Sequence, residues 1–521
     1  MTAMTATPMT LSSMPPEILL NIMESLSVGD IVRAAQSCSY LRAFVRSNKP
    51  LLAKAYNRAY TIHLPLGSNI ENMSSELLYE HAVKSIAIST RLSKSINCSP
   101  LEPRRSITYS LEPLNTTWDE TYRSGYFVRD NLLVFHNLDG LFVLLLGPSG
   151  EIEEHTRTKL NLPEANHEVA YHLSADEKSL FVLLVSVTAG EEDVMEVFEM
   201  CVAKEGFGAV TTHLDIPLPE SMYACQCVAI RDPYCLVANS HSFFLVDWRA
   251  HTCGLYNPFS RKTDWILYDF QTILIHPKEP TLVIFDDDDS DPNHDLNSGI
   301  YVFDIPESLG RPLKDPLAMT TSNCYYSKTR RSLTWKSPFP SQRHIQGKMC
   351  PIGFRCLSNT CWILDVMIIG RTSISECLCW AAKPPTNDRP LVRVSFDSSD
   401  NWTAHVETIE ASSVNASPDD VSSHGNHQLA GSVFSYTFSK LPVQNALQII
   451  VPKFEDGNGN ESGLIRLSVF AGLWATGSTS SDEDVLEDTW WYRSTRGPAV
   501  FDELTGRFYV RHPRGFQIIQ Y

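Results

Sequence analysis

Cysteine pairs are the residues whose spacing comes nearest to metal-binding chemistry. Cys225-x-Cys227 and Cys377-x-Cys379 each place two thiols close together, but a structural zinc site needs at least two residues between its paired cysteines. In a strand, alternation would put both thiols of a pair on one face, where cysteine behaves as a small apolar side chain. We therefore predict that these cysteines pack in a core, and we assign no metal ligand.

Two acidic, turn-like segments have side chains that calcium could use. They are Asp286–Asp289 with Asp291, and Asp456-Gly-Asn-Gly-Asn460. A calcium-binding EF-hand loop needs glycine at its sixth position and glutamate at its twelfth, and no register of either segment supplies both. We interpret both segments as acidic turns exposed to solvent.

Motifs for bond chemistry are missing from the sequence. Gly457, Gly459 and Gly463 have the wrong spacing for a dinucleotide-binding turn, and there is no P-loop, His-Glu-x-x-His or Gly-x-Ser-x-Gly. A catalytic triad assembled only by folding would leave no such pattern. We therefore predict a protein that is not an enzyme, with no catalytic residues and no cofactor.

Two further segments could contact a partner. Trp490-Trp491-Tyr492 could insert into a partner surface or fill a core, and we favour burial because large aromatic side chains mostly serve cores. Arg330, Arg331, Lys336 and Arg343 could bind an acidic or phosphorylated ligand. We interpret these basic residues as part of a solvated loop.

Charge limits the classes of partner. The chain has 521 residues and a formal net charge of −17. Nucleic acids and anionic membranes are themselves negative and bind basic surfaces. We therefore expect neither nucleic acid nor a membrane as a partner.

Cysteine usage and the first residues bear on cellular location. Met1–Thr10 lacks the basic and long apolar regions of a secretory signal, and no run of about 18 apolar residues occurs. The 13 cysteines are scattered and odd in number, which is typical of reduced thiols. We expect a cytoplasmic or nuclear protein.

The clearest organised segment lies in the first fifty residues and is helical. Pro15 and Pro16 suit the start of a helix, and an apolar stripe at helical spacing follows. A capping pair, Ser27 and Asp30, restarts a second helix, and a third runs from about residue 38 to 45. Helices this short leave apolar surface uncovered, so either the rest of the chain or a partner must cover it.

This segment resembles an F-box over residues 11–50. The usual form opens with Leu-Pro-x-Glu-Ile/Leu-Leu, continues with Asp-Leu and later has Val-Cys. The matching residues are Pro15, Glu17, Ile18, Leu19, Ile22, Leu26, Asp30, Ile31, Cys38 and Arg42. Met14 replaces the opening leucine, Ser37 replaces valine, and Leu41 stands where an aromatic residue is usual.

The resemblance implies binding to the small adaptor subunit of an SCF-type (cullin–RING) ubiquitin ligase complex. The residues implied in adaptor binding are Pro15, Ile18, Leu19, Ile22, Leu26, Ile31 and Leu41. The protein would then be a non-catalytic substrate receptor, and the remaining chain would bind an unknown target protein. The alternative is that these helices are an amphipathic cap that packs on the rest of the chain.

The rest of the chain falls into three regions. Residues 1–10 are of low complexity and are predicted to be disordered. Residues 51–103 read as a helical connector, with a helix over Ser74–Ser89. From residue 104 to 521, short β-rich runs alternate with turns in units of about 40–60 residues.

The repeated units predict the fold class. A small helical module followed by a large all-β domain is expected, and the β domain is most simply a β-propeller of about seven blades. The last strands are expected to join a blade that begins near residues 104–135, which would remove exposed sheet edges. Two β-sandwich domains are the competing architecture.

Three classes of function are therefore compatible with the sequence. The first is the substrate receptor, the second is a scaffold that binds the adaptor without delivering a target, and the third is a β-propeller enzyme or ligand binder with a helical cap. Adaptor binding would separate the first two classes from the third, and ubiquitination of a bound protein would separate the first from the second.

Overall fold

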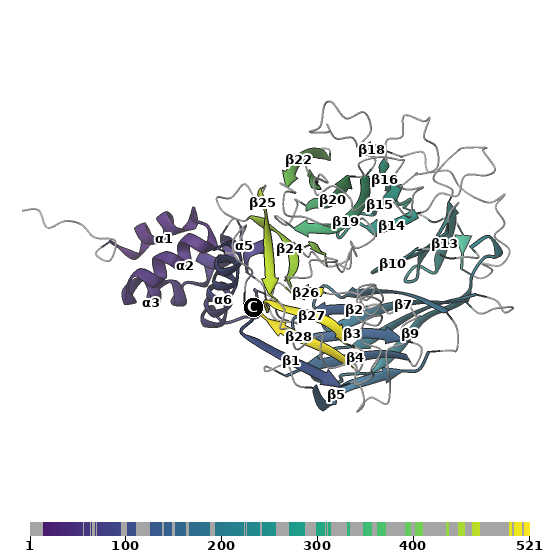
Figure 1. Cartoon of the computed structure of the whole chain (residues 1–521), viewed down its shortest axis with the longest axis horizontal. Coiled ribbons are helices and arrows are strands. Elements are labelled where there is room, and N and C mark those ends of the chain that lie inside the picture. Colours follow the sequence, from purple (N-terminus) through teal and green to yellow (C-terminus); the bar gives the residue numbers. More distant parts are fainter. Residues whose placement is uncertain are drawn as a thin grey trace, which may run out of the picture.

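A computed structural model describes the chain from residue 14 to residue 521 with gaps. The described residues are 14–55, 57–62, 64, 68, 70–94, 102–110, 126–137, 140–147, 152–162, 166–187, 193–222, 225, 227–239, 242–256, 270–286, 299–307, 309, 311–313, 331–333, 347–356, 362–370, 391–397, 402–409, 434–436, 446–453, 461–468, 500–502, 505–512 and 515–521. They form a helical module at one end of the molecule and a larger β domain beside it (Figure 1).

The helical module contains six helices in the part of the chain that the structure describes. They are α1 (Pro16–Glu24), α2 (Val28–Ser37), α3 (Ser39–Ser47), α4 (Lys49–Lys54), α5 (Arg58–Thr61) and α6 (Ser75–Lys94). Pro16 is the first residue of α1, and Pro50 lies in the first turn of α4. The N–H groups of a first turn have no intrahelical acceptor, so proline loses no hydrogen bond there. The cap predicted at Ser27 is confirmed, because its Oγ accepts from Asp30 N at 3.1 Å and donates to Asp30 Oδ2 at 2.7 Å.

One core holds the whole helical module together. Leu19 of α1, Ile31 of α2 and Leu41 of α3 belong to the same buried cluster as Leu52 of α4 and Leu78 of α6. Residues from the predicted F-box and from the predicted connector therefore pack together, and the packing shows no boundary at residue 50. The first three helices cover part of their apolar surface with α4 and α6.

The β domain consists of antiparallel sheets, seven of them within the described ranges. The strands of sheet 1 are β2 (Tyr126–Arg129), β3 (Leu132–Asn137), β4 (Gly140–Leu146) and β5 (Ile152–Leu160). Those of sheet 2 are β6 (Asn166–Leu173), β7 (Ser179–Val187), β8 (Val194–Cys201) and β9 (Val210–Pro217). Sheet 3 contains β10 (Cys227–Arg231), β11 (Tyr234–Ala238), β12 (Phe243–Asp247), β13 (Thr252–Tyr256) and the short β17 (Arg311–Pro312).

The later sheets repeat the same up-and-down order. Sheet 4 contains β14 (Phe270–Ile275), β15 (Thr281–Asp286), β16 (Gly299–Asp304) and β18 (Arg331–Leu333). Sheet 5 contains β19 (Gly347–Cys356), β20 (Trp362–Gly370), β21 (Leu391–Asp397) and β22 (Thr403–Ile409), and sheet 6 contains β23 (Phe434–Tyr436), β24 (Ala446–Lys453) and β25 (Glu461–Ser468). Sheet 7 contains β26 (Val500–Asp502), β27 (Arg507–His512), β28 (Gly515–Gln520) and, at its outer edge, β1 (Arg105–Ser110).

Sheet 7 joins the two ends of the β domain. β1 pairs with β28 along its length, from Arg105 opposite Gln520 to Ser110 opposite Gly515. The first strand of the domain thus completes the last sheet, and β26 of that sheet lies beside β2 of sheet 1. The propeller-like architecture and the joining of the ends are as predicted, and the two-sandwich alternative does not fit seven successive sheets.

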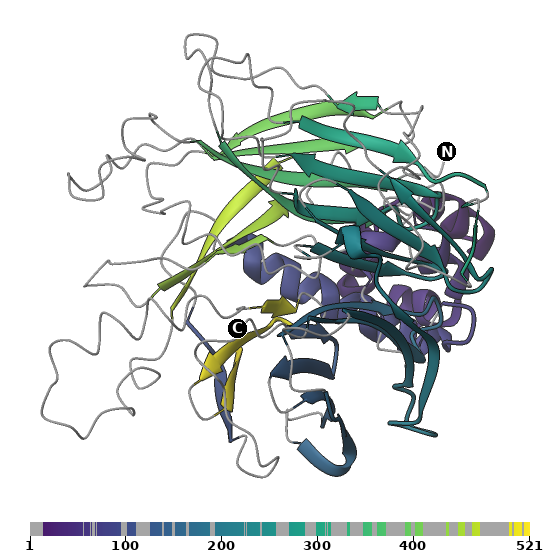
Figure 2. The ribbon, with the colours of Figure 1, turned by 90° about the vertical axis from the view of Figure 1, so that its right-hand side faces the viewer.

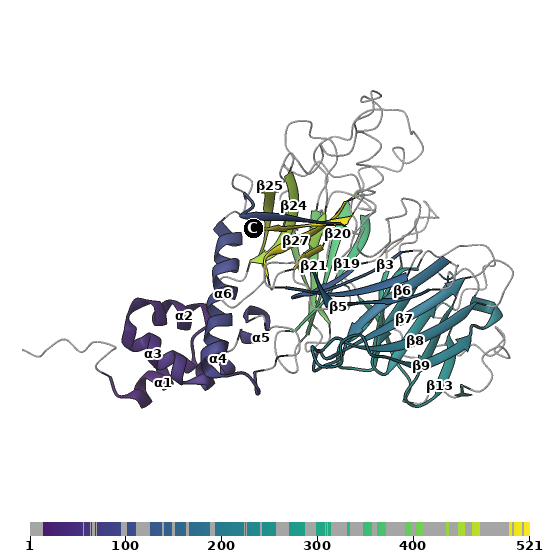
Figure 3. The ribbon, with the colours of Figure 1, turned by 90° about the horizontal axis from the view of Figure 1, so that it is seen from below.

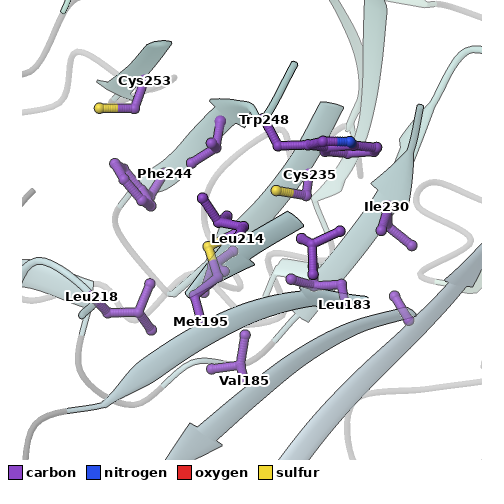
Figure 4. Close-up of a cluster of buried hydrophobic side chains, with 14 of the residues drawn as sticks. Leu183, Val185, Met195, Leu214, Leu218, Ile230, Cys235, Phe244, Trp248 and Cys253 are labelled. Atoms are coloured by element: carbon purple, nitrogen blue, oxygen red, sulfur yellow. The ribbon is translucent and has the colours of Figure 1, made fainter. Parts of the chain in front are cut away.

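Apolar clusters fill the spaces between successive sheets. Separate clusters join sheets 1 and 2, 2 and 3, 3 and 4, 4 and 5, and 7 and 1. Figure 4 shows the cluster between sheets 2 and 3, where the facing side chains include Leu183, Met195, Phe244 and Trp248. Seen from the β domain's far end, the helices lie behind the strands (Figure 2).

Polar contacts also cross between neighbouring sheets. Arg129 Nη2 donates to Glu177 Oε1 at 2.9 Å, and the buried His136 Nδ1 lies 2.7 Å from the hydroxyl oxygen of Tyr171. Burial raises the pKa of Tyr171 well above its ordinary value, so its hydroxyl stays protonated. These contacts link sheet 1 to sheet 2 and fix how the two sheets align.

Two sequence-based expectations about the β domain are corrected. Arg331, one of the basic residues assigned to a solvated loop, begins β18, because this short strand completes the edge of sheet 4. Cys225 lies before β10 and packs between sheets 2 and 3, whereas Cys227 packs between sheets 3 and 4. The two thiols do not share a face, although both are partly buried as small apolar side chains.

A membrane-spanning helix is not found among the described residues: the helices there are too short or too polar to cross a bilayer.

Candidate functional site

Helix α1 presents two large apolar side chains to solvent. Ile18 is 46% exposed and Ile22 is 40% exposed. Residues four apart lie on one face of a helix, so the two isoleucines form a single apolar strip. Pro15, just before the helix, is also exposed, and Leu26 is partly buried after it. We call Pro15, Ile18, Ile22 and Leu26 the α1 strip.

The other three predicted contact residues lie inside the helical module. Leu19 and Ile31 are fully buried, and Leu41 is almost so. Their side chains support the helices from within and offer no surface to a partner in this structure. The structure thus divides the seven predicted residues into four at or near the surface and three in the core.

The position of the α1 strip is fixed by contacts from later in the chain. Asn57, beyond α4, is buried, and its Oδ1 accepts a hydrogen bond of 2.8 Å from the Val28 N–H at the start of α2. A helix leaves its first N–H groups without intrahelical partners, so this side chain satisfies one of them from 29 residues away. The side-chain amide of Asn57 therefore links the start of α2 to the segment after α4.

Surface ion pairs add to this arrangement. Arg46 of α3 contacts Glu76 of α6, and Lys54 of α4 lies 3.8 Å from Glu24 of α1. Exposed pairs of this kind contribute little to stability, about 0–1 kcal/mol each. They help to orient the helices, while the buried cluster supplies most of the stability.

Sequence reasoning missed one exposed aromatic side chain. Tyr40 of α3 is 40% exposed and stacks on Phe44, with ring centroids 6.5 Å apart. The predicted contact residue Leu41 is its neighbour and is buried instead. The spacing of Tyr40 and Phe44, four apart, is the sequence signal that could have identified this second apolar strip.

Titratable groups in the β domain form no site for metal chemistry within the described residues. No group of three or more His, Cys, Asp or Glu side chains there is placed to hold a metal ion. Burial, and to a smaller extent the charge of Glu168, raise the pKa of the Cys227 thiol to about 12, so this thiol is neither a ready ligand nor a nucleophile. The cysteines at 377 and 379, the aromatic residues 490–492 and the side chains of the basic residues 330–343 lie outside the described residues.

His276 is a fully buried titratable side chain of the β domain and is a packing residue. Its Nδ1 accepts from the backbone N–H of Lys278 at 3.2 Å and of Glu279 at 2.9 Å, which closes the β14–β15 turn. The rings of Phe354, Trp362 and Trp402 surround it at centroid distances of 4.8 to 6.1 Å. Burial, and then the charge of Arg231, lower its pKa to about 4, so the ring is neutral near pH 7.

Comparison with protein families matches the helical end of the chain. Residues 11–57 match the F-box-like family. The match includes the α1 strip, Tyr40 and α4, and ends at Asn57, the residue whose side chain bonds to the start of α2. No curated protein matches the chain.

Solved structures similar to this chain include β-rich protein domains. The WD40 domain of SCAP from fission yeast aligns over 75% of this chain and 82% of its own, with 10% identity and a TM-score of 0.32. The Nup170 NTD–Nup53 complex of Chaetomium thermophilum aligns over 83% and 67%, with 9% identity and a TM-score of 0.38. TM-scores this low do not establish a shared fold, so the architecture is assigned from the strand pairing described above.

Proposed function

We propose that this chain, in which residues 11–57 form an F-box-like domain, is the substrate-receptor subunit of an SCF-type (cullin–RING) E3 ubiquitin ligase. The F-box-like domain binds the ligase adaptor, and the β domain binds a target protein. The chain performs no bond chemistry itself. It raises the local concentration of the target near the ubiquitin-charged enzyme.

The observation that carries this proposal is the exposure of the α1 strip within a matched F-box-like segment. Large apolar side chains on a helix usually face a core, and Ile18 and Ile22 instead face solvent. Their burial in an interface would remove apolar surface from water at about 25 cal/mol per Å². Leu19, Ile31 and Leu41 act indirectly in this proposal, by holding α1, α2 and α3 in place.

The β domain is the proposed target-binding part. Its sheets form a large surface separate from α1, and the helical module covers only one side of it (Figure 1). Such a division lets one end of the molecule bind the adaptor while the other binds a target. We place this assembly in the cytoplasm or nucleus, where reduced cysteines are expected.

Co-purification of the full-length chain with the ligase adaptor tests the proposal. The variant is Ile18→Asp with Ile22→Asp, because both side chains are exposed and the changes leave the core intact. An unpaired carboxylate in an apolar contact costs about 1–3 kcal/mol or more. We expect wild type to bind the adaptor and the double variant to lose binding at least about tenfold.

The control is Asn21→Asp, an exposed position on the same helix. It adds negative charge to α1 without changing the apolar strip, so its adaptor binding should stay near that of wild type. Equal binding by wild type and the double variant would exclude the α1 strip as the contact. Absence of adaptor binding by wild type would favour a helical cap and an unrelated function.

Target delivery needs a second measurement. Wild-type complexes that contain adaptor, cullin and RING subunits are supplied with ubiquitin and its activating and conjugating enzymes. We expect ubiquitin to be transferred to a protein that co-purifies through the β domain. We expect this transfer to be lost with the Ile18→Asp, Ile22→Asp variant. Adaptor binding without any modified co-purifying protein would favour a scaffold.

A further inference from the structure

The seam between sheet 7 and sheet 1 closes the β domain. β1 pairs with β28, and the Arg104 N–H extends this pairing with a hydrogen bond of 2.7 Å to the carbonyl oxygen of Gln520. An apolar cluster fills the seam, with Phe135 of sheet 1 facing Tyr509 and Ile518 of sheet 7. The hydroxyl of Tyr509 also donates to the carbonyl oxygen of Asp130 at 3.5 Å. The seam is therefore held by a strand pair, a core and a polar contact.

Helix α6 lies against this seam. Figure 1 and Figure 3 both place α6 near the C-terminus, where β28 ends, and between α1–α3 and the β domain. Ile88 of α6 lies over Gly506 in the turn between β26 and β27, where a Cβ on Gly506 would be 3.6 Å from Ile88 Cγ2. Gly506 has a φ of +67°, a conformation that glycine adopts without strain.

The other side of the seam also approaches α6. His81 of α6 is partly buried and lies close enough to Asp130, in the β2–β3 turn of sheet 1, for the two to interact electrostatically. Ile88 therefore approaches sheet 7, and His81 approaches sheet 1. The helix thus contacts sheet 7 and lies within electrostatic range of sheet 1.

The chain on either side of the seam is tied to the same place. Arg91 of α6 donates from Nη2 to the carbonyl oxygen of Glu102 at 3.0 Å, which holds the segment that leads into β1. The N–H of Tyr521 donates to the carbonyl oxygen of Gly506 at 3.1 Å, and the Tyr521 side chain is buried. The residues before β1 and after β28 thus converge on α6 and the Gly506 turn.

We infer that α6, whose buried face packs in the core of the helical module, also supports the β domain, and that its contact with the Gly506 turn stabilises closure of the ring between sheets 7 and 1. Loosening α6 from this turn loosens the seam, and distorting the turn loosens α6. This coupling is independent of the function proposed above.

Hydrogen exchange of the full-length chain measures this coupling region by region. The variant is Ile88→Asp, which places a carboxylate at the half-buried contact, and the control is Ala87→Asp at the exposed neighbouring position. Both changes introduce the same charge in the same turn of α6, so dipole effects are matched. The control loses more helix propensity, because alanine is a better helix former than isoleucine. We expect only Ile88→Asp to speed amide exchange in β1 and β28, by about tenfold or more.

Sheet 3 supplies the internal reference. Amides of β10–β13 are distant from α6 in the ring and should exchange at wild-type rates in both variants. Faster exchange confined to α6, with β1 and β28 unchanged, would overturn the inference. Equal acceleration of β1 and β28 by Ala87→Asp would also overturn it, because that change leaves the contact intact.

A second pair of variants approaches the contact from the β domain, which covers the case in which Ile88→Asp unfolds the chain. Gly506→Ala strains a left-handed turn position next to α6, and Gly206→Ala strains a turn with a φ of +85° in sheet 2. In both, the new Cβ meets its nearest side-chain atom at 3.6 Å, so the strain is comparable. We expect Gly506→Ala alone to speed exchange in α6, and equal α6 exchange in the two variants would contradict the coupling.

Discussion

Ile18 and Leu19 are neighbours in α1 and have opposite surroundings. Ile18 is 46% exposed, whereas Leu19 is fully buried in the core of the helical module. Successive residues of a helix point about 100° apart, so one can face a core while the next faces solvent. Folding of the module and binding by its surface are therefore assigned to different residues, and they can be tested separately.

Shortening Leu19 is expected to destabilise the helical module. Leu19→Ala removes buried methyl groups and leaves a cavity, which lowers the free energy of unfolding by about 2–5 kcal/mol. Ile18→Ala, at an exposed position, should change it by about 0.5 kcal/mol or less. Hydrogen exchange of α2 and α3 amides in the full chain measures both changes, and equal losses in the two variants would contradict the burial pattern.

Asn57 is expected to stabilise the start of α2. Asn57→Leu keeps much of the side-chain volume but removes the oxygen that accepts from Val28 N. The buried N–H is then left without its partner, which costs about 1–3 kcal/mol. We expect the α2 amides to exchange faster in Asn57→Leu than in wild type. In the exposed control, Asn21→Leu, their exchange should be unchanged. An unchanged α2 would mean that the amide contributes no stability.

His276 is expected to make stability fall in acid. Burial lowers its pKa from 6.5 to about 4 in the folded chain, so between these values the unfolded chain binds more protons. Its contribution is fully present above pH 6.5 and is lost progressively as the pH falls towards 4. Denaturant unfolding between pH 4 and 7 follows this loss.

Replacing His276 by asparagine separates the titration from the turn. The Asn oxygen can still accept from the backbone N–H groups of Lys278 and Glu279, but it does not titrate. We expect His276→Asn to be less stable than wild type at pH 7 and to show a flatter fall towards pH 4. The control is His251→Asn, at an exposed position. If the stability of His276→Asn fell towards pH 4 as steeply as that of wild type, His276 would not be the group responsible.

Trp248 is expected to stabilise the junction of sheets 2 and 3 through packing alone. Its ring lies 5.9 Å from that of Phe181, and its buried Nε1 has no hydrogen-bond partner among the described residues. Trp248→Phe keeps an aromatic ring and removes an unpaired donor, whereas Trp248→Ala leaves a large cavity and costs about 3–5 kcal/mol. Denaturant unfolding should give Trp248→Ala a much lower free energy of unfolding than Trp248→Phe. Similar losses of free energy in the two variants would indicate a role for the indole N–H.

Local sequence patterns are enough to predict the order of the elements and the class of each half. Helical spacing from residue 16 onward and the Ser27–Asp30 cap are local signals, and both appear in the structure. The hairpins of sheets 1 to 4 followed from apolar runs separated by turn residues. These features depend on residues near one another in the chain, where side-chain periodicity and turn chemistry act directly.

Which apolar residues lie at the surface and which lie in the core depends on packing between distant segments. An apolar stripe predicts burial but does not name what covers it, so Leu19, Ile31 and Leu41 could not be told from Ile18 and Ile22 beforehand. The separation arises because α4, which spans the predicted boundary at residue 50, and α6, which lies beyond it, cover part of the stripe. The Asn57–Val28 bond and the contact of Ile88 with Gly506 join residues far apart in sequence, and no local pattern specifies such pairs.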